Sequence, residues 1–117
     1  MSAERGNVRI QVLLWTAQRA TAALLAVCVL VHLVTIIYAV RNGLSAAEIL
    51  GRTRGSAGWA AFYGLFVVAV AVHAPIGLRN ILGESLRWRG AGVDAVMAAL
   101  ALALVAGGLR AVYAVVT

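Results

Sequence analysis

Three long apolar runs, separated by two short polar stretches, dominate the chain. The runs extend over about residues 12–40, 59–82 and 94–116, and the polar stretches lie at 42–56 and 83–92. Each run has at least the roughly 20 residues that a helix needs to cross the hydrocarbon core of a bilayer. Because a spanning segment must satisfy its own backbone hydrogen bonds, each run is expected to be a helix. The pattern predicts an all-α membrane protein, with a single domain of three transmembrane helices over residues 1–117.

The first polar stretch contains a local helix signal. Ser45 and Glu48 have the S-x-x-E spacing of a capping box, and a short apolar piece follows them. The segment 45–52 is therefore expected to form a short helix at the membrane interface. In the third apolar run, small residues such as Gly107 and Gly108 are frequent. Small side chains let helix backbones approach closely in lipid, so this run is expected to serve packing.

Composition supports a membrane location and argues against nucleic acid as a partner. Hydrophobic residues make up 63% of the 117 residues and charged residues only 12%, which is more apolar surface than a soluble domain of this size can bury. All ten basic residues are arginines at helix ends and in loops, where they interact with lipid head groups and set topology. Their distribution favours a cytoplasmic N-terminus, and we expect a multi-pass protein of the bacterial inner membrane.

Two histidines lie within the apolar runs. Ionisable residues inside a bilayer are rare and mostly functional, although an imidazole can also serve only as a hydrogen-bonded packing residue. Neutral imidazole from a helix bundle is a good axial ligand for haem iron, which makes His32 and His73 candidate metal ligands. Gly77 follows His73 on the same helical face and leaves room for a macrocycle or a neighbouring backbone. Arg79 provides a cation for a haem propionate.

The depth of the two histidines predicts two separate haem sites. With a rise of about 1.5 Å per residue, His73 lies about 12 Å and His32 about 24 Å from the same membrane face. Ligands of one upright haem must lie at nearly the same depth, so the two side chains are not expected to hold the same iron. Each would need an opposite ligand from another polypeptide, either a second anchor chain or a second copy of this one.

Two motifs carry a resemblance to a known family. The sequence QRATA, Gln18–Ala22, opens the first run, and HAPIGLRNILGES, His73–Ser85, ends the second. With the three-helix length, these motifs make residues 11–86 similar to the membrane-anchor, cytochrome b type, subunits of succinate dehydrogenase and fumarate reductase. The resemblance implies a haem b ligand at His73 and, as in members with two haems, a further ligand at His32.

The same resemblance implies a quinone site at the mouth of the first helix. The family arginine that borders the quinone pocket corresponds to Arg19, with Gln18 or Thr21 as a hydrogen-bond donor. The chain departs from the family at two positions. Ser85 stands where a quinone-binding tyrosine is often found, and Trp15 stands one turn before the arginine where a serine is expected.

The function implied is a haem b-binding, quinone-interacting membrane anchor without catalytic residues of its own. It would carry electrons between an iron–sulfur subunit and membrane quinone, in a succinate:quinone oxidoreductase that also contains a flavoprotein subunit. Its helices would complete a bundle with a second anchor chain, and two haems would be shared with that chain. A haem-free structural anchor of the same kind of complex is the alternative.

A small multidrug-type transporter is a third possibility, and the acidic residues argue against it. Such a transporter needs a membrane-embedded acid to couple protons. All four acids of this chain, Glu4, Glu48, Glu84 and Asp94, fall at helix ends or in loops.

Overall fold

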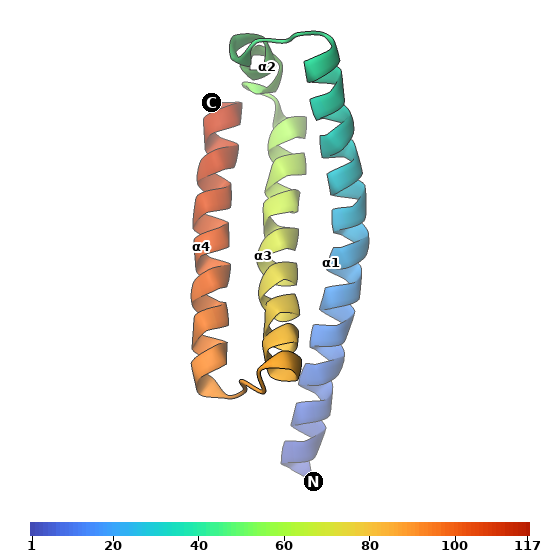
Figure 1. Cartoon of the computed structure of the whole chain (residues 1–117), viewed down its shortest axis with the longest axis vertical. Coiled ribbons are helices and arrows are strands. Elements are labelled where there is room, and N and C mark those ends of the chain that lie inside the picture. The colour runs from blue at the N-terminus through green and yellow to red at the C-terminus, as the bar shows by residue number, and fades with distance from the viewer.

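The computed structural model describes residues 1–117 and contains only helices (Figure 1). The elements are α1 (Ser2–Arg41), α2 (Ala46–Thr53), α3 (Ala57–Ser85) and α4 (Ala91–Val116). Helices α1, α3 and α4 are long and apolar enough to cross a membrane, whereas α2 is a short helix at one end. The predicted all-α fold with three spanning helices is confirmed.

Helix α1 extends well beyond the apolar run that predicted it. It has 40 residues and begins at Ser2, whereas the apolar run begins near residue 12. At about 1.5 Å per residue its length is about 60 Å, roughly twice the thickness of the hydrocarbon core. The polar N-terminal turns of α1 therefore protrude below the ends of α3 and α4 (Figure 1).

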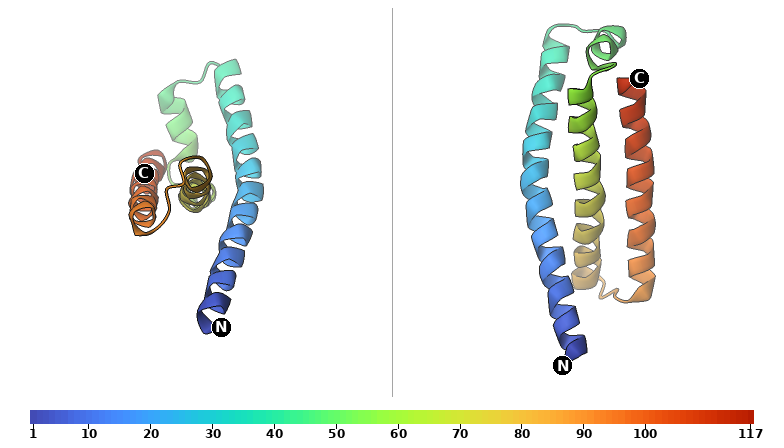
Figure 2. Two further views of the ribbon diagram at one scale, coloured as in Figure 1. Left: turned by 60° about the horizontal axis from the view of Figure 1, so that its bottom comes forward. Right: turned by 180° about the vertical axis from the view of Figure 1, so that it is seen from behind.

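Helix α3 lies between the other two long helices (Figure 2). It packs against both α1 and α4, while α1 and α4 have little contact with each other. Only 8 of the 117 residues are buried, among them Cys28 of α1 and Ala69 of α3. Most of the apolar side chains of this chain must therefore be covered by lipid or by another polypeptide.

The face of α1 that meets α3 carries polar residues. The less exposed positions of α1 recur at alternating steps of three and four residues, which is the period of a helix packed along one seam. They include Gln18, Thr21, Leu25, Cys28, His32 and Thr35. The polar members of this seam are the side chains from which the candidate site is built.

Helix α2 caps the C-terminal end of α4. Its own start is the predicted capping box: the backbone N–H of Glu48 donates to Ser45 Oγ (3.3 Å), and the Glu48 carboxylate accepts from the Ser45 N–H (2.7 Å). At its other end, Thr53 Oγ1 donates to the Val115 carbonyl (2.6 Å) and the Gly55 N–H to the Val116 carbonyl (2.8 Å). The last carbonyls of a helix lack partners within it, so these two bonds satisfy α4 and fix α2.

Candidate functional site

The antiparallel packing of α1 and α3 brings four of the predicted site residues together. His73 Nδ1 lies 3.2 Å from Thr21 Oγ1 across the interface. One turn further along α3, a Cβ atom added to Gly77 would lie 3.0 Å from Gln18 Nε2. We refer to His73, Gly77, Gln18 and Thr21 as the His73 cluster. The space beside Gly77 is thus occupied by the side-chain amide of Gln18.

The His73 cluster contains an unsatisfied acceptor. Gln18 Oε1 is buried and has no hydrogen-bond partner. Leaving a buried polar atom unpaired costs about 1–3 kcal/mol, so such an atom is rare unless a further group completes the site. His73 itself is half-buried, and no group of this chain hydrogen-bonds to its Nε2 atom.

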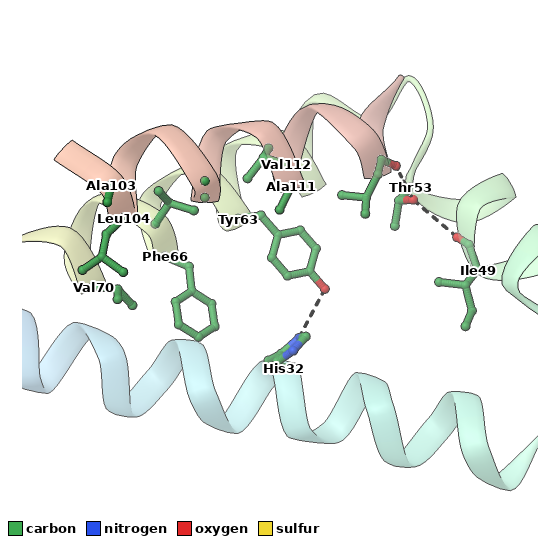
Figure 3. A pocket seen from close by; sticks show the side chains of 14 residues that line it. His32, Ile49, Thr53, Tyr63, Phe66, Val70, Ala103, Leu104, Ala111 and Val112 are labelled. Carbon is green, nitrogen blue, oxygen red and sulfur yellow. Dashed lines mark hydrogen bonds between the residues drawn. The ribbon is translucent and has the colours of Figure 1, made fainter. Parts of the chain in front are cut away.

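His32 has aromatic surroundings instead (Figure 3). Its Nδ1 atom lies 3.4 Å from the hydroxyl oxygen of Tyr63, and its ring stands edge-on to the rings of Tyr63 and Phe66, with centroids 5.7 and 5.9 Å away. The sequence had not singled out Tyr63 or Phe66, because aromatic residues in an apolar run are usual in membrane helices.

An apolar cavity of about 660 Å³ adjoins His32. Its walls come from α3 and α4, including Val70, Leu104 and Ala111, and its end is closed by Ile49 and Thr53 of α2 (Figure 3). A volume of several hundred cubic ångströms is typical of small-molecule and cofactor sites. The cavity is lined by His32 and not by His73.

The two histidines lie at different levels of the bundle. Thr21, opposite His73, and His32 are eleven residues apart on α1, and Tyr63, opposite His32, is ten residues from His73 on α3. At 1.5 Å per residue both spacings correspond to about 15–17 Å along the helix axes. The two imidazoles are therefore separated along the bundle, as their predicted depths indicated.

The remaining predicted site residues lie outside the His73 cluster. Arg79 Nε donates to Asp94 Oδ1 of α4 at 2.6 Å, so its charge is already paired, although both side chains are about half exposed. Arg19 is exposed, and its guanidinium carbon lies 5.1 Å from the ring centroid of Trp15. Ser85 is exposed at the last position of α3.

These features define the class of protein. It is a multi-pass membrane protein of three candidate spans, and polar side chains and a half-buried imidazole lie between two of these spans. The chain belongs to the succinate dehydrogenase/fumarate reductase transmembrane subunit family, whose model matches residues 2–112. It is accordingly a membrane anchor subunit of such a complex, and the family implies association with the other subunits. No curated protein and no solved structure matches the chain.

Proposed function

We propose that this anchor subunit binds haem b through His73 and passes electrons between the iron–sulfur subunit of its complex and membrane quinone. The main support for this proposal is the hydrogen bonding of the two His73 ring nitrogens. One of its nitrogens faces Thr21 at 3.2 Å, and the other has no partner within the chain. An imidazole held through one nitrogen, with the second nitrogen free, has the donor arrangement that a haem iron ligand needs.

The residues of the cluster fit a haem ligand shared with another polypeptide. His73 supplies one axial nitrogen, and the unpaired Gln18 Oε1 atom is consistent with a site that a further component completes. A bound haem would supply one-electron transfer. The opposite ligand would come from a second anchor chain or from a second copy of this chain.

His32 is proposed as the ligand of a second haem at the other level, next to the apolar cavity. Arg79 is proposed as the partner of a propionate. Its ion pair with Asp94 is about half exposed, and exposed pairs contribute only about 0–1 kcal/mol. Replacing Asp94 by a propionate as the partner of Arg79 would therefore cost little free energy.

Quinone is proposed to bind beside Arg19, in the N-terminal half of α1. The exposed Arg19 guanidinium would stabilise negative charge that develops on a quinone oxygen, and Gln18 Nε2 would donate a hydrogen bond. Thr21 and Ser85 complete the proposed set. The hydroxyl of Thr21 already contacts backbone carbonyls of α1, which makes it a poorer donor than Gln18.

The same proposal assigns partner subunits to this anchor and a side of the membrane to each end of its helices. The iron–sulfur subunit, with the flavoprotein behind it, would dock on the face from which α1 protrudes, and that face would be the cytoplasmic side of a bacterial inner membrane. The whole of residues 1–117 would act as one transmembrane anchor domain in contact with lipid.

The test is the haem content of the purified complex. Wild-type complex should show dithionite-reduced b-type absorption bands and at least one haem in a pyridine haemochrome assay. His73→Ala should remove one haem, and His32→Ala should remove a different one. Val68→Ala is the matched control, since Val68 is an exposed residue of the same helix. Unchanged haem in His73→Ala, relative to this control, would refute the ligand assignment.

A haem-free structural anchor is the second candidate. It is favoured by one observation: each imidazole already has a neighbour of its own, Thr21 for His73 and Tyr63 for His32. Both rings could then hold helices together without any metal. Less than one haem per wild-type complex would favour this function over the first.

A further inference from the structure

We propose that Thr21 is a positioning residue for His73, which fixes the imidazole proton on Nδ1 and leaves the lone pair on Nε2. This inference rests on the proposed haem ligation. It identifies the side chain that would hold the His73 ring in the tautomer and orientation that ligation requires. Metal-binding histidines typically donate their second ring N–H to a neighbouring acceptor, which sets both the tautomer and the orientation of the ring.

The Thr21 hydroxyl has a single hydrogen and three polar neighbours. Thr21 Oγ1 lies 2.7 Å from the Ala17 carbonyl oxygen, 3.2 Å from the Gln18 carbonyl oxygen and 3.2 Å from His73 Nδ1. A carbonyl can only accept, and a hydroxyl has one hydrogen to donate. The much shorter contact to Ala17 takes this hydrogen. The hydroxyl oxygen then faces His73 with a lone pair, so Nδ1 must carry the proton.

The other tautomer breaks a short hydrogen bond that the first one keeps. If Nδ1 were the acceptor, Thr21 would have to give up its short bond to the Ala17 carbonyl. The proton would then be on His73 Nε2, where the chain offers no acceptor. An unpaired N–H in an apolar environment is costly, whereas an unpaired imidazole lone pair is the feature that a metal ligand requires.

Helix geometry keeps the Thr21 hydroxyl in place. A threonine within a helix commonly bonds to the carbonyl four residues earlier, and its branched Cβ leaves few rotamers. Thr16 makes the same bond, from its Oγ1 to the Val12 carbonyl at 2.8 Å, but on the exposed side of α1. Thr16 is therefore a matched control: the same residue type and bond, without an imidazole.

The first experiment measures the haem midpoint potential in the purified complex for Thr21→Val, Thr21→Ser and Thr16→Val. Valine keeps the shape of threonine and removes the acceptor oxygen, so the imidazole becomes a weaker donor to ferric iron. Loss of such a partner typically lowers metal affinity by about 10–100-fold. A tenfold loss for ferric relative to ferrous iron corresponds to a rise of about 59 mV. Thr21→Ser and Thr16→Val should both retain the wild-type potential.

The second experiment determines the tautomer of His73 in the absence of haem. The chain has two histidines, so His32→Ala leaves His73 as the sole source of imidazole ¹⁵N signals in the full chain in lipid nanodiscs. The expected spectrum has a protonated Nδ1 and an unprotonated Nε2, and Thr21→Val should shift it toward a mixture of tautomers. Thr16→Val in the same background should leave it unchanged.

The outcomes separate this inference from the proposed function. A proton on Nε2 in the nanodisc spectrum, or equal potentials in Thr21→Val and Thr16→Val, would overturn the role of Thr21 while leaving the haem intact. A wild-type complex without b-type haem would instead refute the proposed function, and the ¹⁵N spectrum would still decide the tautomer.

Discussion

Replacement of Gly108 by alanine is expected to force α4 away from α3. A Cβ atom at this position would lie 2.5 and 2.8 Å from the two Cγ atoms of Val67 and 3.2 Å from its Cβ. Carbon atoms prefer separations of about 3.5–4.0 Å. Rotating Val67 would move its methyl groups but not its Cβ, so the backbones must separate to relieve the overlap.

The magnitude follows from two opposing effects. Overpacking of this kind costs about 1–3 kcal/mol. Alanine is a better helix former than glycine by about 0.8–1.0 kcal/mol, which offsets part of this cost. The free energy of unfolding should therefore fall by up to about 2 kcal/mol. Gly107→Ala is a matched control one residue away, because apart from the adjacent residues and backbone of α4 no atom lies within 4 Å of its added Cβ, and that variant should be neutral or slightly more stable.

The assay is reversible unfolding of the full chain in mixed micelles, followed by circular dichroism. Val67→Ala removes both clashing methyl groups, so the double variant Val67→Ala/Gly108→Ala should show a favourable coupling of at least about 0.5 kcal/mol in a double-mutant cycle. If Gly108→Ala were as stable as Gly107→Ala, or if the cycle showed no coupling, the close α3–α4 approach at this level would be wrong.

Three further predictions concern the helix ends. Thr53→Val removes the bond to the Val115 carbonyl, which should destabilise the docking of α2 by about 1–2 kcal/mol and speed amide hydrogen exchange there. The bonds that Glu48 accepts from the Ser45 N–H and hydroxyl hold its pKa below the ordinary 4.5. The stability that these bonds contribute should therefore be present above pH 4.5 and be lost as the pH falls through the lowered pKa. Thermal unfolding measured against pH should show this loss in the wild type, and Glu48→Gln should lack it. Asp94→Asn breaks only an exposed ion pair, so it should change stability by less than about 1 kcal/mol, and high salt should abolish the difference in thermal unfolding.

The candidate site was only partly predictable. The sequence identified His73, Gly77, Gln18 and Thr21 as separate candidates, and the fold gathers them into one cluster. Arg79 was expected near a haem propionate, but in the fold it meets Asp94 on the following helix. Nothing in the sequence indicated this pairing, because Asp94 lies in the first turn of α4 and Arg79 lies six residues before the end of α3, and charges are common in both places.

Local patterns alone determined the spanning helices and the start of α2. A spanning helix is predicted by comparing the length of an apolar run with a fixed bilayer thickness. The start of α2 is predicted from a capping box, which joins residues three positions apart. Both predictions can be made without knowing the fold. Only the tertiary structure decided which polar side chains meet. Thr21 and His73 are 52 residues apart, and their contact depends on the rotation and register of α1 against α3. In lipid, apolar faces that contact protein and faces that contact acyl chains have similar compositions, so hydropathy cannot select that register. Close packing and hydrogen bonds between the assembled helices select it.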